Sequence, residues 1–288
     1  MSKTLSFGLV GLGRMGAALA ASALDHGIHV VSYDPHRPTE ELVAAGLRAV
    51  DSLSHLGNEL EHPRIVLLYV PAGAVVDRLL DELLGVLEPG DIVADGGNSY
   101  WRDSQRRGDW LAKHEIGFVD LGTSGGISGA RHGACFMAGG EAAHVAKIEP
   151  LLRELAVEGG YVHAGPSGAG HLAKLVHNGI EFGMLQAIGE GIALLEAYNR
   201  ADDTRVSLDT VEILRVWRHG SVIRSWLIDL LHEGYRDRGG LDPGQTVARS
   251  HHGGFGATAS RIRLGGECRL PDPGASPGAA RSGRDPIS

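Results

Sequence analysis

The sequence predicts a doubly wound α/β domain followed by an all-helical domain. Short apolar runs alternate with amphipathic stretches as far as residue 165, which is typical of a parallel sheet with crossover helices. A glycine-rich turn directly follows the first run, and from about Ser167 the apolar residues recur at helical spacing. We therefore expect the α/β domain over residues 1–165, the helical domain over residues 166–242 and an unstructured tail over residues 243–288.

The individual elements follow from the same pattern. Apolar runs bounded by glycine or polar residues predict strands at Leu5–Val10, His29–Tyr33, Ile65–Val70, Ile92–Ala94 and Phe118–Leu121. Amphipathic stretches predict helices at Met15–His26, Thr39–Ala45, Ala74–Leu84, Tyr100–His114 and Ala142–Leu155. In the helical domain, the apolar period predicts helices at Ser167–Tyr198, Leu208–His219 and Val222–Tyr235.

The composition excludes several classes of function. A formal net charge of −8 disfavours nonspecific binding to nucleic acid or anionic membranes, because both attract basic surfaces. No apolar run approaches the ~18–20 residues that span a bilayer, and the first residues lead into a strand, not a signal peptide. Two cysteines, Cys135 and Cys268, are too few for a disulfide framework. We expect a soluble cytoplasmic protein, and no metal site stands out among its 15 histidines.

Residues 243–288 differ from the rest of the chain. They hold 9 of the 43 glycines, 5 prolines and 6 arginines but no lysine, and they show neither helical nor strand period. The apolar period is lost abruptly at Pro243, which motivates the hypothesis that the tail is an out-of-frame ending. Resequencing the gene around codon 242 tests this hypothesis, and an uninterrupted frame in independent isolates would contradict it.

The first candidate site is the turn Gly11-Leu12-Gly13-Arg14-Met15-Gly16. It joins a predicted strand to a predicted helix, and Asp34 ends the next strand 18 residues beyond Gly16, as in a Rossmann-type dinucleotide site. Gly11 permits the tight turn, Gly13 lets the backbone approach a pyrophosphate, and Gly16 lets the helix pack closely. The helix N-terminus then faces the phosphates with free N–H groups. The predicted cofactor-binding residues are Gly11, Gly13, Arg14, Met15, Gly16 and Asp34.

Asp34 bears on the choice between NAD and NADP. Its carboxylate would accept hydrogen bonds from the adenosine ribose hydroxyls and repel a 2′-phosphate, so NAD is the expected cofactor. Arg37, three residues later, either offsets that repulsion or is a solvated loop residue. NADP therefore stays open as an alternative.

A polar stripe marks the long helix predicted from Ser167. At about 100° per residue its members lie within roughly 120° of arc. They are His171, Lys174, His177, Asn178 and Glu181. Burial would lower the pKa of Lys174 and raise that of Glu181, which suits a base and an acid, whereas their mutual attraction opposes both shifts. We expect the surrounding apolar residues to bury the rest of the helix. The alternative is a solvated face with an ordinary Lys–Glu pair.

Two glycine-rich turns follow predicted strands. Asp95-Gly96-Gly97-Asn98-Ser99 comes after Ile92–Ala94, and Gly122-Thr123-Ser124-Gly125-Gly126 comes after Phe118–Leu121. Ligands of open α/β sheets bind beyond the carboxyl ends of strands, and free N–H groups in the second turn could bind a carboxylate. Taken alone, each turn could equally lack a ligand.

Together these motifs resemble the decarboxylating 6-phosphogluconate dehydrogenases, particularly their shorter bacterial form. The resemblance runs from about residue 4 to residue 242, with its motifs in the family's order. They are Gly11–Gly16, Asp95–Ser99, Ser124–Gly126 and His171–Glu181. The related β-hydroxyacid dehydrogenases share the first motif, the Ser-Gly-Gly and the lysine, but would not be expected to carry His177 and Glu181.

The resemblance implies oxidative decarboxylation of 6-phosphogluconate to ribulose 5-phosphate in the pentose phosphate pathway, with hydride transfer to NAD or NADP. It implies that Lys174 is the general base and then acid, and that Glu181 is the second acid. The residues that it implies for holding the substrate are Asn98, Ser124, Gly125, Gly126, His177, Asn178 and Arg224, with Asn98 also at the nicotinamide end. A homo-oligomer, either a dimer or a tetramer, is implied as well.

The sequence also departs from the family's pattern. Phe182 replaces a tyrosine that contacts the substrate phosphate in many members, and the family's later phosphate-binding turn and its C-terminal Arg and His have no match. Two alternatives therefore stay open. One is a β-hydroxyacid dehydrogenase acting on an unphosphorylated hydroxyacid, and the other is a nucleotide-binding protein with impaired catalysis.

Overall fold

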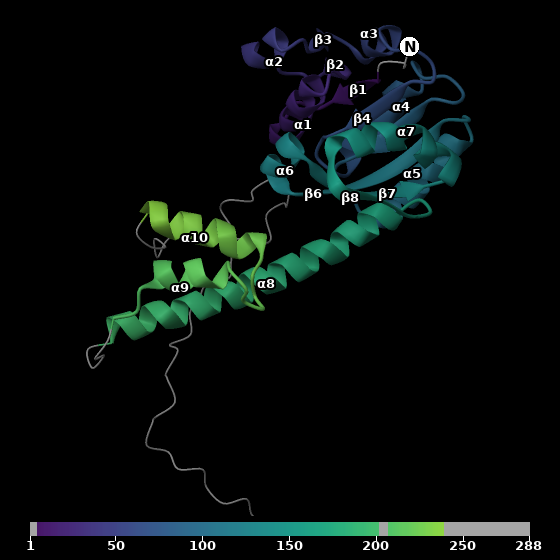
Figure 1. Ribbon diagram of the computed structural model, residues 1–288. Helices are drawn as coiled ribbons and strands as arrows, with labels where there is room; N and C mark the ends of the chain where they lie inside the picture. Colours follow the sequence, from purple (N-terminus) through teal and green to yellow (C-terminus); the bar gives the residue numbers. More distant parts are fainter. Residues whose placement is uncertain (1–4, 202–206, 239–288) are drawn as a thin grey trace, which may run out of the picture. The chain divides into compact units, whose positions relative to one another are not determined.

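The computed structural model describes residues 5–201 and 207–238, and the predicted tail lies outside them. Eight strands form one sheet in the order β3-β2-β1-β4-β5-β6-β7-β8 (Figure 1). A helical region of three helices, α8 to α10, follows the sheet. The predicted fold class, a Rossmann-type sheet followed by helices, is confirmed.

The first six strands are parallel, and their order reverses between β1 and β4. Gly8 of β1 pairs with Val31 of β2 on one side and with Val66 of β4 on the other. Ligands of such sheets bind at this reversal, beyond the carboxyl ends of the strands. The strands are β1 (Ser6–Val10), β2 (His29–Tyr33), β3 (Arg48–Val50), β4 (Ile65–Leu68), β5 (Ile92–Asp95) and β6 (Gly117–Ser124).

Helices bury apolar side chains on both faces of the sheet. One core cluster joins Phe7 to Leu19 of α1 and Ile148 of α7, and the other joins Val66 to Leu80 of α4. Because side chains alternate along a strand, the neighbours Val66 and Leu67 of β4 belong to opposite clusters. The helices of this part are α1 (Arg14–Asp25), α2 (Glu40–Ala44), α3 (Leu53–Asn58), α4 (Ala74–Leu83), α5 (Trp101–Ala112), α6 (Gly126–His132) and α7 (Ala142–Leu155).

Two further strands extend the sheet beyond β6. β7 (Ala134–Gly140) runs antiparallel to β6 and pairs Cys135 with Ser124. β8 (Ala156–Gly165) runs parallel to β7 with an irregular register. The chain then enters α8 directly, so this end of the sheet carries the long helix.

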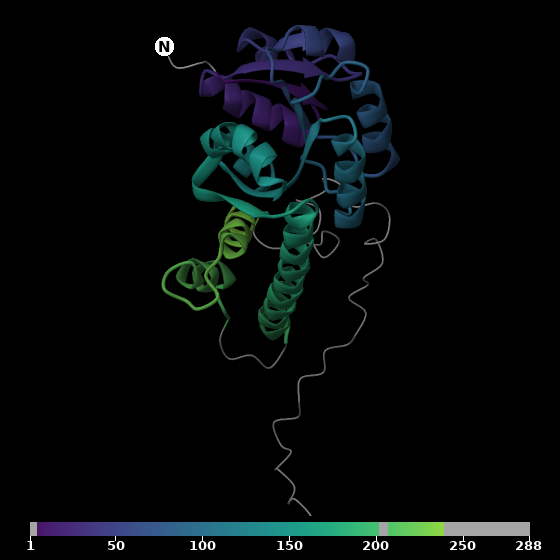
Figure 2. The same cartoon turned by 90° about the vertical axis from the view of Figure 1, so that its right-hand side faces the viewer.

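The helical region consists of α8 (Ala169–Arg200), α9 (Thr210–Trp217) and α10 (Trp226–Arg238). The first turns of α8 contact β6, β7 and β8 (Figure 2). Farther along the chain, Ile192 of α8 packs with Leu214 of α9 and Leu231 of α10 in a small apolar core. The two ends of α8 are therefore packed against different partners.

Several elements differ from the predictions. The sequence analysis missed β3, α3, α6, β7 and β8, which are short, exposed or rich in glycine. β6 continues to Ser124, so Gly122 and Thr123 lie in the strand and not in a turn. The helix predicted from Val222 begins instead at Trp226. The Ser225 hydroxyl accepts the N–H of Ile228 and so caps the first turn of α10.

Candidate functional site

The glycine turn connects β1 to α1 where the strand order reverses. Gly11 has a φ of +99°, and a Cβ there would lie 2.4 Å from the backbone oxygen of Tyr69. A Cβ at Gly16 would lie 2.0 Å from the oxygen of Gly11, so the helix begins directly against the turn. A Cβ at Gly13 would meet no atom within 4 Å, which leaves open space beside the α1 N-terminus. These residues fit a dinucleotide pyrophosphate.

Asp34 lies just beyond β2 and contacts this turn. One carboxylate oxygen accepts the N–H of Leu12 at 2.6 Å, and the other accepts the N–H of His36 at 2.7 Å. The Asp34 side chain is only 13 % exposed. Arg14 and Arg37 are exposed, and neither forms an ion pair with it. The position of a ribose-binding carboxylate is thus occupied by a partly buried acid without an arginine partner.

A buried carboxylate holds the N-terminus of α8 on the sheet. Asp120 of β6 is 0 % exposed, and it accepts the backbone N–H groups of Gly168 at 2.6 Å and His171 at 2.8 Å. A Cβ at Gly122 would lie 2.7 Å from the oxygen of Gly170 and 2.8 Å from the Cβ of Lys174. The absence of a side chain at Gly122 therefore lets α8 place Lys174 against β6.

Lys174 is partly buried at this contact. Burial lowers the pKa of its amine below the ordinary value of 10.5, and the charges of Glu181 and Cys135 partly oppose that change. A lowered pKa increases the neutral fraction of the amine near pH 7, which is the form that acts as a general base.

The rest of the polar stripe gathers around the end of β6. His177 Nε2 lies 3.0 Å from Ser124 Oγ, and His177 Nδ1 lies 3.3 Å from Asn178 Oδ1 and 3.7 Å from Glu181 Oε2. Asn178 is buried, and His177 and Glu181 are partly buried. This burial argues against the alternative of a freely solvated helix face.

The end of β6 leads directly into the Ser-Gly-Gly segment. Gly125 and Gly126 have φ values of +109° and +60°, a region that favours glycine. The segment thus turns sharply beside the His177–Ser124 contact.

The turn after β5 presents Asn98 to solvent. Asp95 is 0 % exposed, and its two oxygens accept the N–H of Gly97 at 3.0 Å and the hydroxyl of Ser99 at 2.7 Å. The Asn98 side chain is exposed and makes no hydrogen bond within residues 5–201 and 207–238. The turn is therefore fixed at both ends, and its central amide is available to a ligand.

Arg224 is not brought into the cluster. It lies exposed in the segment between α9 and α10, and no contact among the described residues joins it to Lys174 or Ser124. Sequence reasoning had also placed it within a predicted helix, whereas α10 begins two residues later.

The apolar side of α8 also departs from expectation. The prediction that these residues bury the rest of the helix is wrong for its first half, where Val176 is 56 % and Ile180 is 60 % exposed. The physical reason is that α9 and α10 pack around Ile192, farther along the helix. The exposed apolar face of α8 consists of Leu172, Leu175, Val176, Ile180, Phe182 and Met184.

Sequence reasoning missed several buried residues that support the site through hydrogen bonds. Asp120 is one, and an acid within an otherwise apolar strand was the available signal. Ser104 of α5 is another: its Oγ lies 2.7 Å from Nδ1 of His171, which is 2 % exposed. The Tyr69 hydroxyl lies 2.9 Å from Thr123 Oγ1, and burial raises the pKa of Tyr69, so the phenol stays protonated.

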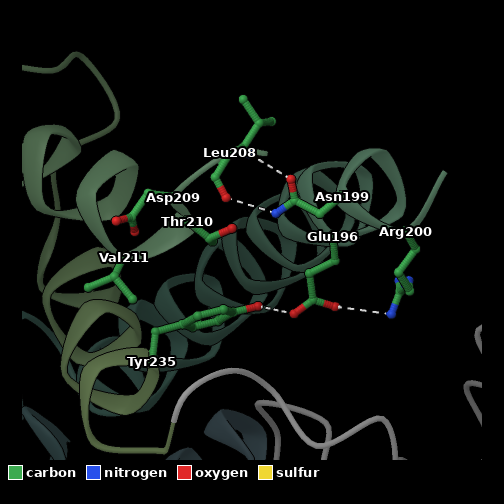
Figure 3. Close-up of a pocket in the computed structure, with 8 residues that line it drawn as sticks. All are labelled: Glu196, Asn199, Arg200, Leu208, Asp209, Thr210, Val211 and Tyr235. Carbon is green, nitrogen blue, oxygen red and sulfur yellow. Dashed lines mark hydrogen bonds and ion pairs between the residues drawn. The ribbon is translucent and has the colours of Figure 1, made fainter. Parts of the chain in front are cut away.

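A cavity of about 340 Å³ lies between the end of α8, the start of α9 and α10 (Figure 3). The Tyr235 hydroxyl donates to Glu196 there, and the Asn199 side chain bonds the N–H and the carbonyl of Leu208 at 2.7 and 2.8 Å. None of the predicted site residues lines this cavity. These hydrogen bonds join α8 to Leu208 and to α10, and the cavity is separate from the Lys174 cluster.

Within the part of the chain that the structure describes, no group of three or more His, Cys, Asp or Glu could hold a metal ion. Over the same residues, no helix is both long and apolar enough to cross a membrane.

Known proteins resemble this chain in sequence and in structure. The family model described as the NAD binding domain of 6-phosphogluconate dehydrogenase matches residues 6–165. YqeC of Bacillus subtilis (strain 168), whose name as a 6-phosphogluconate dehydrogenase is itself provisional, is 41 % identical over 239 residues, covering 83 % of this chain and 78 % of YqeC. The NAD⁺-dependent, decarboxylating 6-phosphogluconate dehydrogenase of Haloferax volcanii is 38 % identical, covering 82 % of this chain and 76 % of that protein.

Among solved structures, the 6-phosphogluconate dehydrogenase of Plasmodium falciparum is similar with a TM-score of 0.69 and 29 % identity. The match covers 79 % of this chain but 50 % of the Plasmodium chain. This chain therefore spans about half the length of that longer relative.

Proposed function

Because the chain belongs to the 6-phosphogluconate dehydrogenase family and carries its NAD(P)-binding domain, we propose that it oxidises 6-phosphogluconate and decarboxylates the product to ribulose 5-phosphate. The observation that carries this proposal is the partly buried Lys174 amine, whose pKa burial lowers, on the helix that also carries Glu181. Oxidation of a hydroxyl group needs a neutral base, and the later protonation of carbon needs an acid.

Lys174 and Glu181 divide the proton transfers. A bound nicotinamide supplies the hydride acceptor. Neutral Lys174 takes the proton of the substrate's C3 hydroxyl during oxidation, which leaves a 3-keto acid. Loss of carbon dioxide moves the electron pair of the C1–C2 bond toward that carbonyl, and protonated Lys174 donates its proton to the oxygen. Glu181 then protonates the carbon that lost carbon dioxide, while Lys174 recovers the enediol proton.

The remaining polar residues are proposed substrate contacts. Ser124, Gly125 and Gly126 would bind the carboxylate, with His177 and Asn178 on the sugar hydroxyls. Asn98 would contact the substrate and the nicotinamide end, since its amide is exposed and uncommitted. Arg224 stays a proposed phosphate ligand on the resemblance alone, and its fork-shaped guanidinium suits that role.

NAD is the proposed preferred cofactor. Asp34 contacts the glycine turn through Leu12 and has no arginine partner, so its negative charge would repel the 2′-phosphate of NADP. The Haloferax relative, NAD⁺-dependent by name, supports this choice.

We further propose a homo-oligomer, because the exposed apolar face of α8 would gain from burial against another copy. A cytoplasmic location stays a proposal, and a reducing compartment is in line with a chain that has two cysteines.

Steady-state turnover tests the proposed function. The purified full chain is incubated with 6-phosphogluconate and either NAD⁺ or NADP⁺, and both reduced cofactor and carbon dioxide are measured. We expect equal amounts of the two products and a higher kcat/KM with NAD⁺. Lys174→Met should lower kcat by about 10²–10⁴-fold, the usual contribution of general acid–base catalysis. Lys113→Met, an exposed lysine on the sheet domain, is the matched control and should leave kcat unchanged.

Other outcomes would point elsewhere. Reduced cofactor without carbon dioxide, or turnover only of unphosphorylated hydroxyacids, would favour a β-hydroxyacid dehydrogenase. Binding of NAD⁺ by a folded sample without any turnover would indicate a nucleotide-binding protein with impaired catalysis.

A further inference from the structure

Arg107 of α5 is the largest side chain that the described residues bury completely, with 1 % exposed. A guanidinium cannot lose its charge in a protein, so burial is costly unless every donor direction finds an acceptor. A salt bridge of this kind is weak evidence for stability alone. Its position and its partners therefore call for an explanation.

The guanidinium joins two segments at the carboxyl edge of the sheet. Its Nε donates to Asp77 of α4 at 2.9 Å, and its Nη2 donates to the carbonyl of Gly73 at 3.0 Å. Its Nη1 donates to Asp95 at 3.3 Å and to Ser99 at 3.2 Å. One side chain thus ties the start of α4 to the turn that follows β5.

The second of these segments carries Asn98. Asp95 and Ser99 stand at the two ends of its turn and bond each other at 2.7 Å. Arg107 donates hydrogen bonds to both of them. Asn98 between them is exposed and makes no hydrogen bond to any described residue. The Asn98 backbone is therefore held by the Arg107 network and not by contacts of its own side chain.

We infer that Arg107 is a positioning residue: it fixes the Asn98 turn against the start of α4, and thereby the amide that meets the nicotinamide riboside end of the cofactor. This inference rests on the proposed function, since Asn98 is a proposed contact. We assign Arg107 no contact with substrate or cofactor, because its side chain is only 1 % exposed and already makes four hydrogen bonds to protein acceptors.

The neighbouring Arg106 offers a matched control. Arg106 also pairs with Asp77 at 2.9 Å, but it is 58 % exposed and has no contact with Asp95 or Ser99. Losing Arg106 removes a guanidinium from Asp77 and from Asp103, neither of which lies in the Asn98 turn, whereas losing Arg107 also removes the contacts to that turn. Ser99→Ala loosens the Asn98 turn in a second, independent way. It removes one acceptor of Arg107 and also the hydroxyl that donates to Asp95.

The experiment compares Arg107→Lys, Ser99→Ala and Arg106→Gln with the unchanged chain. NAD⁺ binding is measured by calorimetry without substrate, and KM and kcat are measured well below each melting temperature. We expect Arg107→Lys to weaken NAD⁺ binding and raise its KM about tenfold, because a lysine cannot make the forked contacts. Ser99→Ala should give a smaller change in the same direction, and Arg106→Gln should stay within twofold.

The outcomes separate this inference from the proposed function. Unchanged NAD⁺ affinity in both Arg107→Lys and Ser99→Ala would overturn the positioning role, as would an equal loss in Arg106→Gln. If Arg107→Lys fails to fold, Ser99→Ala alone decides the matter by the same binding measurement. Absence of carbon dioxide from the unchanged chain would overturn the proposed reaction, yet the NAD⁺ titration would still test Arg107.

Discussion

Apolar side chains are buried in the sheet but exposed along the first half of α8. Phe7, Leu67 and Val119 in the sheet are 0 % exposed, whereas Val176 and Ile180 of α8 are 56 % and 60 % exposed. The sheet obtains its cover from helices of the same chain, on both faces. Among the described residues, none near the first half of α8 covers its apolar side chains in this way. The side of α8 that faces the sheet is nevertheless fixed by Asp120.

This difference shows that the spacing of apolar residues in a sequence predicts which face of an element is buried, but not which element or molecule covers that face. Substitutions in the sheet should lower the stability of the single chain. Substitutions on the exposed apolar face of α8 should instead change association, and substitutions where α8 touches the sheet should combine stability with catalysis.

The largest effect should come from the sheet core. Leu67→Ala removes a fully buried side chain of the central strands and should lower the free energy of unfolding by about 2–5 kcal/mol. Urea denaturation measures this loss. Val43→Ala on α2, where the side chain is 51 % exposed, is the control and should change stability by less than about 0.5 kcal/mol. Equal losses of unfolding free energy at the two positions would contradict the proposed difference between buried and exposed apolar residues.

An intermediate effect is expected where α8 touches β6. Gly122→Ala places a Cβ 2.8 Å from that of Lys174, so the helix must shift, and we expect a loss of about 1–3 kcal/mol together with a lower kcat. Gly179→Ala on α8 is the control, since a Cβ there meets no atom within 4 Å. It should stabilise the dissociated chain by about 0.5–1 kcal/mol. Destabilisation by Gly179→Ala would show that another molecule or segment occupies that space.

A smaller effect concerns pH. Burial lowers the pKa of Lys174, and the charge of Glu181 raises it in part. Glu181→Gln removes that opposing charge, so the pKa of Lys174 should fall further and the rise of kcat/KM with pH should move to lower pH. Glu190→Gln, exposed on the same helix, should leave the profile in place. A shift to higher pH would contradict the assignment of Lys174 as the base.

The smallest effect on the single chain is expected at Ile180. Ile180→Ser should change the unfolding free energy of the dissociated chain by less than about 0.5 kcal/mol, because the side chain is already exposed. Sedimentation velocity should nevertheless show weaker self-association. Gln186→Ser, an exposed polar change on α8, is the control. Unchanged association in Ile180→Ser would exclude this face from the proposed oligomer contact.

Much of the fold could be predicted because strong local patterns carry it. The strand–glycine turn–helix pattern located β1 and α1 to within a residue or two, and the long apolar period located α8. β8 could not be predicted, since it contains a Gly-Gly pair and mostly exposed residues. Its hydrogen bonds to β7, and not its own sequence, define it as a strand.

The candidate site was predictable where function leaves a local motif and not where it depends on contacts distant in sequence. The glycine turn and the Lys174 stripe are motifs of this kind. The contact of Asp120 with His171, 51 residues later, is not, and neither is the contact of Arg107 with Gly73, 34 residues earlier. Such pairs become visible only once the sheet order is known.

The single uninterrupted helix α8 has a mechanical consequence. Its 32 residues extend over about 48 Å at ~1.5 Å per residue, with one end fixed by Asp120 and the other packed on α9 and α10. A rotation of about 5° at the fixed end would carry the far end through about 4 Å on this geometry. On this geometry, a small rotation beside Lys174 would be amplified at the opposite end of the helical region.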